Sequence, residues 1–245
     1  MIDGCLNDSV GDSIAEKNKF YCELTGQYWI WKNDHESDIV GLCHYRRYFW
    51  LNEIKKRFCR KNFTSLTADV ERFLVTDNVE SYLQSCDIIL PKPYIFYDDN
   101  IKSQLVNTHG QEGFDLMIDS IKKFFPEYFP TTEKVFNRRF LYVGNLLITH
   151  KKIFDEYSQW LFTILQDVES KIDLNDKKNL RLLGFLSERL LNLYVAHNKM
   201  QVKEVPQIFI VKDDVDEENL YINLRYIKRR YFGKFYDMKD KILGK

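Results

Sequence analysis

The run His44-Tyr45-Arg46-Arg47 brings together four side chains that can bind a charged ligand or move a proton. Two adjacent guanidiniums can donate paired hydrogen bonds to a diphosphate. The neighbouring imidazole and phenol can orient a sugar or share a proton. The alternative is a surface basic pair beside a packed histidine and tyrosine. If the run is functional, its residue types point to binding of a phosphorylated ligand.

His109 and Glu188 are the candidates for proton transfer. His109 stands in the polar stretch that begins at Asn107, although an isolated histidine is also common as a hydrogen-bonded structural residue. Glu188 lies in an apolar stretch, where a carboxylate needs a partner. An ordinary ion pair with Arg189 or Arg181 is the alternative reading of that carboxylate.

Asn145 interrupts the apolar run of residues 142–148. A buried amide must find hydrogen-bond partners, either in the backbone or in a bound ligand. The motifs G-x-G-x-x-G, G-x-x-x-x-G-K-[ST], H-E-x-x-H and G-x-S-x-G do not occur in the chain. Dinucleotide oxidoreduction, P-loop phosphoryl transfer, zincin proteolysis and α/β-hydrolase chemistry therefore lack their usual sequence support.

Composition narrows the class of protein. The 36 basic and 36 acidic side chains cancel, which argues against a nucleic-acid binder. The five cysteines include no C-x-x-C pair, so the sequence predicts neither a disulfide framework nor a zinc site and fits a reducing compartment. No run approaches about 18 apolar residues, and we expect a cytoplasmic protein that is soluble or peripheral on the inner face of the plasma membrane.

The elements that must position these residues alternate between short apolar strands and amphipathic helices, which predicts an α/β sheet with helices on both faces. A capping-box pattern, Ser13 and Glu16, precedes the first helix. The strands are expected at 38–43, 86–91, 140–148 and 207–211, and the helices at 14–33, 67–84, 115–125, 152–168 and 181–196.

The strand at 38–43 is interpreted as buried, so that it delivers His44 and the residues after it to the carboxyl end of the sheet, where open α/β sheets bind ligands. Residues 94–109 follow Pro91 and Pro93 and are predicted to be mobile or to face a ligand. Residues 1–212 are predicted to form one domain. Residues 213–245 are predicted to form a charged, helical tail.

The chain resembles a bacterial glycosyltransferase-like family of capsular and exopolysaccharide synthesis, formerly a domain of unknown function. The order and spacing of the matching segments cover most of residues 12–206. The segments are NKFYCELT at 18–25, YWIWKN at 28–33, GLCHYRRYF at 41–49, TH at 108–109, PEY at 126–128, FDEYSQWLF at 154–162 and GFLSERLL at 184–191.

The resemblance implies a GT-A-like nucleotide-sugar transferase fold, with a central mixed sheet flanked by helices. It also implies transfer of a hexose, with galactose in pyranose or furanose form as the expected sugar, to a growing or lipid-linked glycan. His44, Arg46 and Arg47, with Tyr45 beside them, then bind the donor where related folds keep a metal-binding acidic motif. Asn145 would lie on the central strand near the acceptor.

In the same reading Glu188 is the candidate for the catalytic base or for a carboxylate that orients the acceptor, and His109 is the other candidate for the base. The D-x-D motif with which many GT-A enzymes hold a divalent metal against the donor diphosphate occurs here as Asp214 and Asp216, in a solvated acidic run. We therefore expect no metal site and no cofactor, because the arginines take over the role of the metal, with Mn²⁺ or Mg²⁺ as the alternative.

One departure from the family pattern concerns the start of the chain. Family members carry an additional N-terminal strand and loop before the stretch that matches residues 12–18, and here Met1 stands almost directly at that stretch. The expected fold is therefore N-terminally incomplete. The alternative function is a non-catalytic truncated homologue that acts as a glycan- or protein-binding module. The basic aromatic residues of the tail predict an anionic membrane surface as a partner, against a solvated terminal helix.

Overall fold

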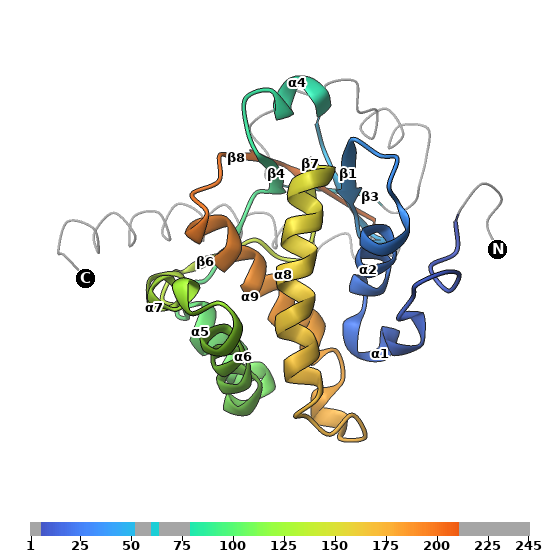
Figure 1. Ribbon diagram of the computed structural model, residues 1–245. Helices are drawn as coiled ribbons and strands as arrows, with labels where there is room; N and C mark the ends of the chain where they lie inside the picture. The colour runs from blue at the N-terminus through green and yellow to red at the C-terminus, as the bar shows by residue number, and fades with distance from the viewer. Residues whose placement is uncertain (1–5, 52–59, 64–78, 211–245) are drawn as a thin grey trace. The chain divides into compact units, whose positions relative to one another are not determined.

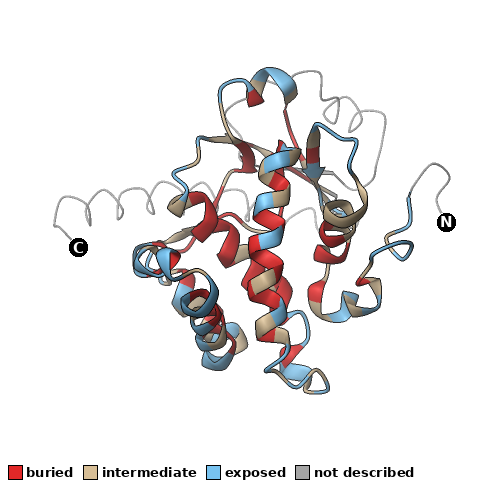
Figure 2. Ribbon diagram, viewed as in Figure 1, coloured by how far each residue is buried: buried red, intermediate tan, exposed pale blue. Residues whose placement is uncertain are grey.

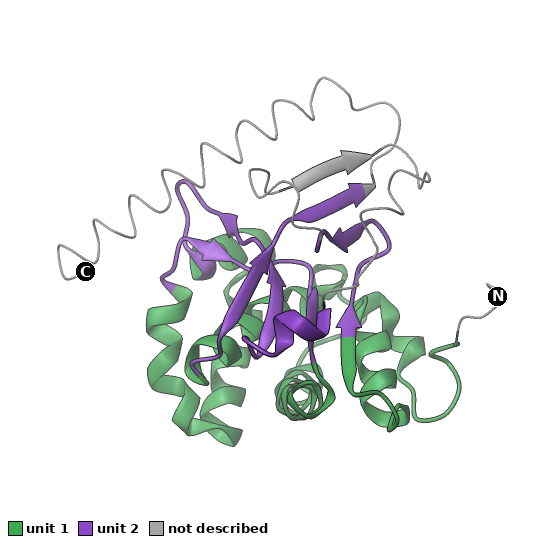
Figure 3. Cartoon of the chain, turned by 90° about the horizontal axis from the view of Figure 1, so that it is seen from above, with its two compact units in different colours: residues 1–40, 102–136, 150–198 green, residues 41–101, 137–149, 199–245 purple. Residues whose placement is uncertain are grey.

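A computed structural model of the protein describes residues 6–51, 60–63 and 79–210 (Figure 1). The chain divides into two compact units, and it passes between them several times (Figure 3). Unit 1 contains residues 1–40, 102–136 and 150–198, and unit 2 contains residues 41–101, 137–149 and 199–245. The tail predicted at 213–245 lies outside the described residues, and the single domain over 1–212 stays a prediction.

Unit 1 is helical, and it contains all of α5 except Ile101, which belongs to unit 2. Its helices are α1 (Asn18–Tyr21), α2 (Leu24–Asn33), α5 (Ile101–His109), α6 (Gln111–Phe124), α7 (Phe129–Phe136), α8 (Lys151–Glu169) and α9 (Leu182–His197), with 3₁₀ turns at Ala15–Lys17, Pro126–Tyr128 and Lys177–Asn179. None of the described helices is both long enough and apolar enough to cross a bilayer. The helices predicted at 115–125, 152–168 and 181–196 are confirmed.

Helix α8 forms the core of unit 1 because one stripe of its surface is apolar and packs against α2, α6 and α9. Phe154, Leu161, Phe162 and Leu165 have no exposed surface, and buried and exposed positions alternate along the helix (Figure 2). Burial of each such side chain stabilises the fold by about 1.5–3 kcal/mol. Helix α9 is apolar around most of its circumference, as expected for a helix surrounded by others.

The helix predicted over 14–33 is interrupted. Cys22 has φ +53°, so α1 ends before it and α2 begins at Leu24. The predicted capping box is wrong as well, because the Ser13 hydroxyl accepts a hydrogen bond from the Ala15 amide at 3.0 Å and the first turn is a 3₁₀ helix. The N-terminal region of unit 1 therefore consists of three short helical segments.

The sheets belong to unit 2, except for the first residues of β1 and the last residue of β7, which are assigned to unit 1. The four-stranded sheet has the order β1-β7-β4-β8, the three-stranded sheet β2-β9-β3, and β5 pairs with β6. Strand β4 runs antiparallel to β7 and parallel to β8, and the short helix α4 packs on β4. The elements are β1 (Ile39–Leu42), β2 (Arg47–Phe49), β3 (Arg60–Phe63), α4 (Val79–Leu83), β4 (Ile88–Pro91), β5 (Tyr94–Ile95), β6 (Phe140–Leu141), β7 (Leu147–His150), β8 (Val202–Val205) and β9 (Gln207–Ile210). The predicted α/β fold with a mixed central sheet is confirmed.

Strand β4 is the buried core of this sheet, since all four of its residues are buried. The strands predicted at 86–91 and 207–211 are confirmed as β4 and β9, whereas β2, β3, β5 and β8 were not predicted. The strand at 38–43 is confirmed as β1, but its predicted burial is wrong. In the four-stranded sheet β1 is an edge strand with Val40 as its buried residue, and Gly41 is exposed.

Two further expectations differ from the structure. Residues 94–109, predicted as mobile or ligand-facing, form β5 and α5, whose Ile101 and Leu105 are fully buried, so the predicted mobility is wrong, while the ligand-facing role stays a prediction. The single strand predicted at 140–148 is divided into β6 and β7 by a turn at Gly144 and Asn145, which have φ +83° and +53°. Positive φ at two consecutive residues is incompatible with a continuous strand. The predicted helix 67–84 is described only from α4 onward, and its earlier residues lie outside the described part.

Candidate functional site

The four residues His44, Tyr45, Arg46 and Arg47 form a tight turn in unit 2 between β1 and β2. The His44 and Arg47 backbones exchange two hydrogen bonds, with N···O distances of 3.1 and 2.9 Å, which closes the turn. Strand β2 begins at Arg47 and pairs with β9, so the sheet fixes the end of the turn. The sequence-predicted donor residues therefore occupy one short, backbone-closed segment.

Both arginines of this turn lie beside an aromatic ring. The rings of His44 and Tyr45 lie 4.4 Å apart, and Tyr45 is 69% exposed. The Arg46 guanidinium stands 4.7 Å from the centre of the Tyr45 ring, and that of Arg47 stands 5.3 Å from the centre of the Phe209 ring on β9. Aromatic faces attract and orient guanidiniums while leaving their N–H groups able to bind anions.

Gly144 explains how Arg47 fits into unit 2. A Cβ atom at Gly144 would lie 2.7 Å from Nη1 of Arg47, so the guanidinium rests against a backbone that only glycine leaves open. Asn145 follows directly, is 3% exposed and belongs to the turn before β7. Its predicted place on the central strand is wrong, because the left-handed backbone at 144–145 ends β6 and starts a new strand. The structure thus brings the turn that contains Asn145 next to the turn of the predicted donor residues.

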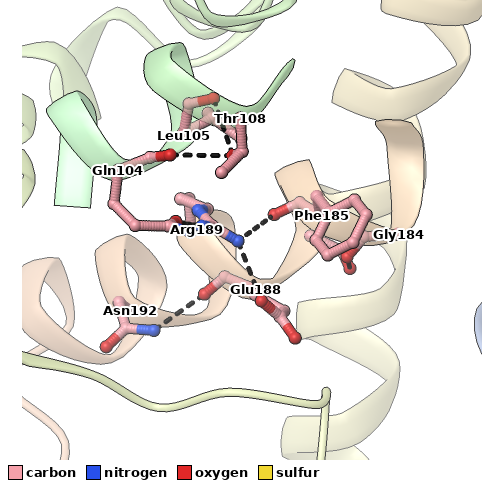
Figure 4. A network of polar contacts seen from close by, with 9 residues as sticks. Gln104, Leu105, Thr108, Gly184, Phe185, Glu188, Arg189 and Asn192 are labelled. Carbon is pink, nitrogen blue, oxygen red and sulfur yellow. Dashed lines mark hydrogen bonds and ion pairs between the residues drawn. The ribbon is translucent and has the colours of Figure 1, made fainter. Parts of the chain in front are cut away.

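In unit 1, Glu188 belongs to a polar network on α9 (Figure 4). Arg189 Nη1 donates hydrogen bonds to the Glu188 carboxylate at 2.8 Å and to the Phe185 carbonyl at 3.0 Å. Arg189 Nη2 donates to Gln104 Oε1 on α5. Arg189 is 2% exposed and the Glu188 side chain 13% exposed, so the predicted partnership of Glu188 with Arg189 is confirmed.

His109 ends α5 and lies beside the same helix face. Its ring lies against the Phe185 ring, with ring centres 4.0 Å apart and the two planes tilted by 32°. Burial, followed by the positive charges of Arg189 and Arg181, lowers the pKa of His109 below its ordinary value. An imidazole with a lowered pKa is neutral near pH 7 and can accept a proton. His109 and Glu188, predicted separately, therefore lie in one cluster around the first turns of α9.

Arg181 and Cys22 close the network at the start of α9. Arg181 has φ +61°, and its guanidinium stands 5.4 Å from the centre of the Phe185 ring. A hydrogen bond with the Cys22 thiol is the main cause that raises the pKa of Arg181, while burial raises the pKa of Cys22. Gln104, Phe185 and Cys22 were missed from the sequence. For Phe185 the signal was present, because residues 181, 185 and 189 repeat at helical spacing.

Taken by chemistry, the turn in unit 2 offers cations for an anionic ligand, and the network in unit 1 offers a carboxylate and a neutral imidazole. Over the described residues, no group of three His, Cys, Asp or Glu side chains is placed to hold a metal ion. Asp214 and Asp216 lie outside the described part of the chain. The assignment of Arg46 and Arg47 to a diphosphate stays a prediction.

Comparison with known proteins places these features in a family. Residues 2–199 match the family model described as Domain of unknown function (DUF4422). The solved apo structure of WbbM, a bifunctional glycosyltransferase, is similar to this chain, with 30% sequence identity and a TM-score of 0.77. The similarity covers 85% of this chain and 40% of that chain, so this chain spans less than half the length of WbbM. No curated protein matches the chain. Since the family model covers residues 2–199 of 245, the chain belongs to the DUF4422 family, and it shares its α/β fold with part of a glycosyltransferase.

Proposed function

We propose that this chain is a glycosyltransferase that moves a hexose from a nucleotide-sugar donor to a glycan acceptor of a bacterial surface polysaccharide. The similarity to WbbM over 85% of the chain carries this proposal. Galactose, in pyranose or furanose form, is the expected hexose. The acceptor is a growing or lipid-linked glycan, which fits a chain that works in the cytoplasm or on the inner face of the plasma membrane, with anionic lipid as a partner surface.

The donor diphosphate is assigned to the turn of His44, Tyr45, Arg46 and Arg47. Guanidiniums bind phosphate oxygens through paired N–H donors, and their charge stabilises the departing diphosphate. Exposed Tyr45 offers a face for the nucleotide or the sugar. We propose that these arginines meet the diphosphate charge without a resident cofactor, with Mn²⁺ or Mg²⁺ as the alternative that the assay below distinguishes.

The chemical step is assigned to Glu188 or His109 as base. The base takes the proton of an acceptor hydroxyl, and the hydroxyl oxygen forms a bond to the anomeric carbon of the donor sugar. The bond from that carbon to the diphosphate breaks, and the nucleoside diphosphate leaves with the electron pair. Asn145 is proposed to contact the acceptor.

The experiment is donor binding by calorimetry, followed by transfer, over a panel of nucleoside diphosphates and nucleotide sugars with and without Mn²⁺. In the double variant Arg46→Ala, Arg47→Ala we expect the donor Kd to rise at least about 100-fold, because each lost charge-assisted contact weakens binding about 10-fold or more. The matched control is Arg138→Ala, Arg139→Ala, an adjacent arginine pair in unit 2, which we expect to leave the Kd unchanged.

Each outcome separates the candidates. Selective binding and turnover without Mn²⁺, lost in the Arg46 and Arg47 variant alone, supports the proposal. Binding that requires Mn²⁺ would transfer the diphosphate role to a metal. Glycan binding without turnover of any donor would support the non-catalytic binding module, and equal donor binding in the double variant would refute the arginine site.

A further inference from the structure

The Arg189 network in unit 1 suggests how the roles of Glu188 and His109 are divided, and this inference rests on the proposed function. Arg189 is held at three points: the Phe185 carbonyl, the Glu188 carboxylate and the side-chain oxygen of Gln104 (Figure 4). Two of these points lie on α9 and one on α5. A guanidinium fixed from two helices has little freedom to turn, so the carboxylate that it holds is fixed as well.

Arg189 is a poor choice if its role is only to stabilise the fold. The side chain is 2% exposed, and its Nε finds no hydrogen-bond acceptor among the described residues. A buried donor without a partner costs free energy, and an apolar side chain of similar volume often replaces a buried ion pair without loss. A buried charge retained at this cost calls for a role beyond packing.

The ion pair sets what Glu188 can do. Protonation of Glu188 would remove its charge from Nη1 of Arg189, at 2.8 Å, and leave a buried guanidinium without compensation. An ionised carboxylate in this position accepts hydrogen bonds strongly but accepts a proton poorly. Its side chain keeps 13% exposure, which lets a ligand hydroxyl reach it.

His109 has the opposite character. His109 lies against Phe185, and Phe185 precedes Glu188 and Arg189 by about one turn of α9. The two arginines whose charges lower the pKa of His109, after burial, lie on α9 or directly before it. Burial, and after it the charges of Arg189 and Arg181, oppose a positive charge on the imidazole. Arg181 also donates a hydrogen bond to the Cys22 sulfur. The neutral ring is therefore the form present near pH 7. After the ring accepts a proton, the nearby positive charges favour transfer of that proton to water.

We propose that Arg189 is a positioning residue that holds Glu188 as a fixed, ionised acceptor for a substrate hydroxyl, and that His109 is the base that removes the proton. Glu188 then contributes to binding, and His109 contributes to the chemical step. Arg189 acts on both, through its hydrogen bond to Glu188 and through its charge near His109. Gln104 keeps the guanidinium in place.

The first test uses transfer kinetics with the donor and glycan pair identified by the panel above. In Glu188→Gln and Arg189→Met we expect the acceptor KM to rise about 10- to 100-fold, the value of one hydrogen bond to a charged group, with kcat within a few-fold of wild type. In His109→Asn we expect kcat to fall about 10²- to 10⁴-fold with little change in KM. Lys178→Met, which removes an exposed cation of unit 1, is the matched control and should change neither.

The pH profile of kcat/KM distinguishes a positioning role of Arg189 from a purely structural one. The acidic limb of kcat/KM should lie below the ordinary histidine pKa of about 6.5, move toward it in Arg189→Met and return in Arg189→Lys. If Glu188→Gln instead removes the acidic limb and His109→Asn keeps it, Glu188 is the base and the proposal is overturned. An unchanged limb and an unchanged acceptor KM in Arg189→Met overturn it equally.

A second measurement does not depend on turnover. NMR titration of the His109 ring reads its charge in the free protein. In Arg189→Met the ring should titrate at higher pH than in wild type, because the charge of Arg189 helps to lower the pKa of His109, while Lys178→Met leaves it unmoved. If Arg189→Met does not move the His109 titration, the assigned roles fail even if the chain transfers sugar. If the titration moves but no donor is turned over, the Arg189 electrostatics stand and the proposed function fails.

Discussion

Asp167 offers a quantitative test of how unit 1 is held together. Its carboxylate on α8 accepts hydrogen bonds from Ser120 Oγ at 2.6 Å, from Lys123 Nζ at 2.8 Å and from Lys171 Nζ. Ser120 and Lys123 lie on α6, so the carboxylate joins two helices of the core. The Asp167 side chain is 9% exposed. We predict that Asp167→Asn, which preserves shape and removes charge, destabilises the protein.

The magnitude follows from the two lysines. A hydrogen bond to a charged group contributes about 1.5–3 kcal/mol, but the Lys123 and Lys171 side chains are 58% and 35% exposed, and solvent screens both. About 1 kcal/mol for each lysine gives a loss of about 2 kcal/mol at pH 7. For a chain of 245 residues this lowers Tm by about 4–8 °C.

The pH dependence of the Asp167 contribution has a definite sign. Burial alone would raise the pKa of Asp167, but hydrogen bonds from Lys123, Lys171 and Ser120 outweigh it and hold the pKa well below its ordinary value of about 3.9. A folded pKa below the unfolded one stabilises the fold above pH 3.9, and this contribution fades as pH falls through the folded value. The difference between wild type and Asp167→Asn should stay constant from pH 7 to 5 and shrink by about 1 kcal/mol at pH 3.

The assay is urea unfolding of wild type and variants at pH 7, 5 and 3. Asp155→Asn is the matched control on the same helix, because its partner Lys151 is an i,i+4 neighbour and the Asp155 side chain is 38% exposed. We expect a loss of about 0.5 kcal/mol or less in the control. Equal losses in the two variants, or an Asp167→Asn loss that does not change with pH, would refute the reasoning.

Two further predictions concern packing. Gly144→Ala places a Cβ atom 2.7 Å from Arg47 Nη1 at φ +83°, so it should lower the free energy of unfolding by about 1–3 kcal/mol and weaken donor binding by displacing Arg47. Urea unfolding measures the stability and calorimetry measures the donor Kd. A donor Kd equal to that of wild type would contradict the predicted displacement of Arg47. Phe162→Ala removes a fully buried ring that stacks on Trp31 and meets Tyr28 edge-on, and it should cost about 3–5 kcal/mol in urea unfolding, so a loss below about 1 kcal/mol would contradict this packing.

Elements with a strong local pattern could be predicted from the sequence. Helix α8 carries apolar residues at helical spacing over five turns, and α9 is apolar enough to belong inside a helical layer. Strand β4 is a short apolar run stopped by proline, which is the signal of a buried strand. These elements need no information from distant parts of the chain to be assigned.

Elements decided by single residues or by tertiary pairing could not be predicted. Cys22 takes a backbone with positive φ without being glycine, and nothing in its neighbourhood indicates this. At Asn145 the Gly144-Asn145 pair is a turn signal that the strand assignment overlooked. Strand β8 has three half-buried residues and mixes charged with apolar positions, and it owes its conformation to parallel pairing with β4. Strand β2 has three residues and depends on pairing with β9.

His109 and Glu188 were predicted singly and not as one cluster, because tertiary contacts bring them together. Arg181, Phe185 and Arg189 share one face of α9 by helical spacing, which the sequence contains. The contact that orients Arg189 toward Glu188 comes from Gln104, which is 85 residues away in the sequence. Gln104 belongs to α5, and this helix was not predicted because Pro91 and Pro93 precede it. Contacts from both α5 and α9 hold the Arg189 guanidinium, and its position decides how its charge acts on Glu188 and His109. The choice between these two residues as base therefore becomes testable only when α5 and α9 are considered together.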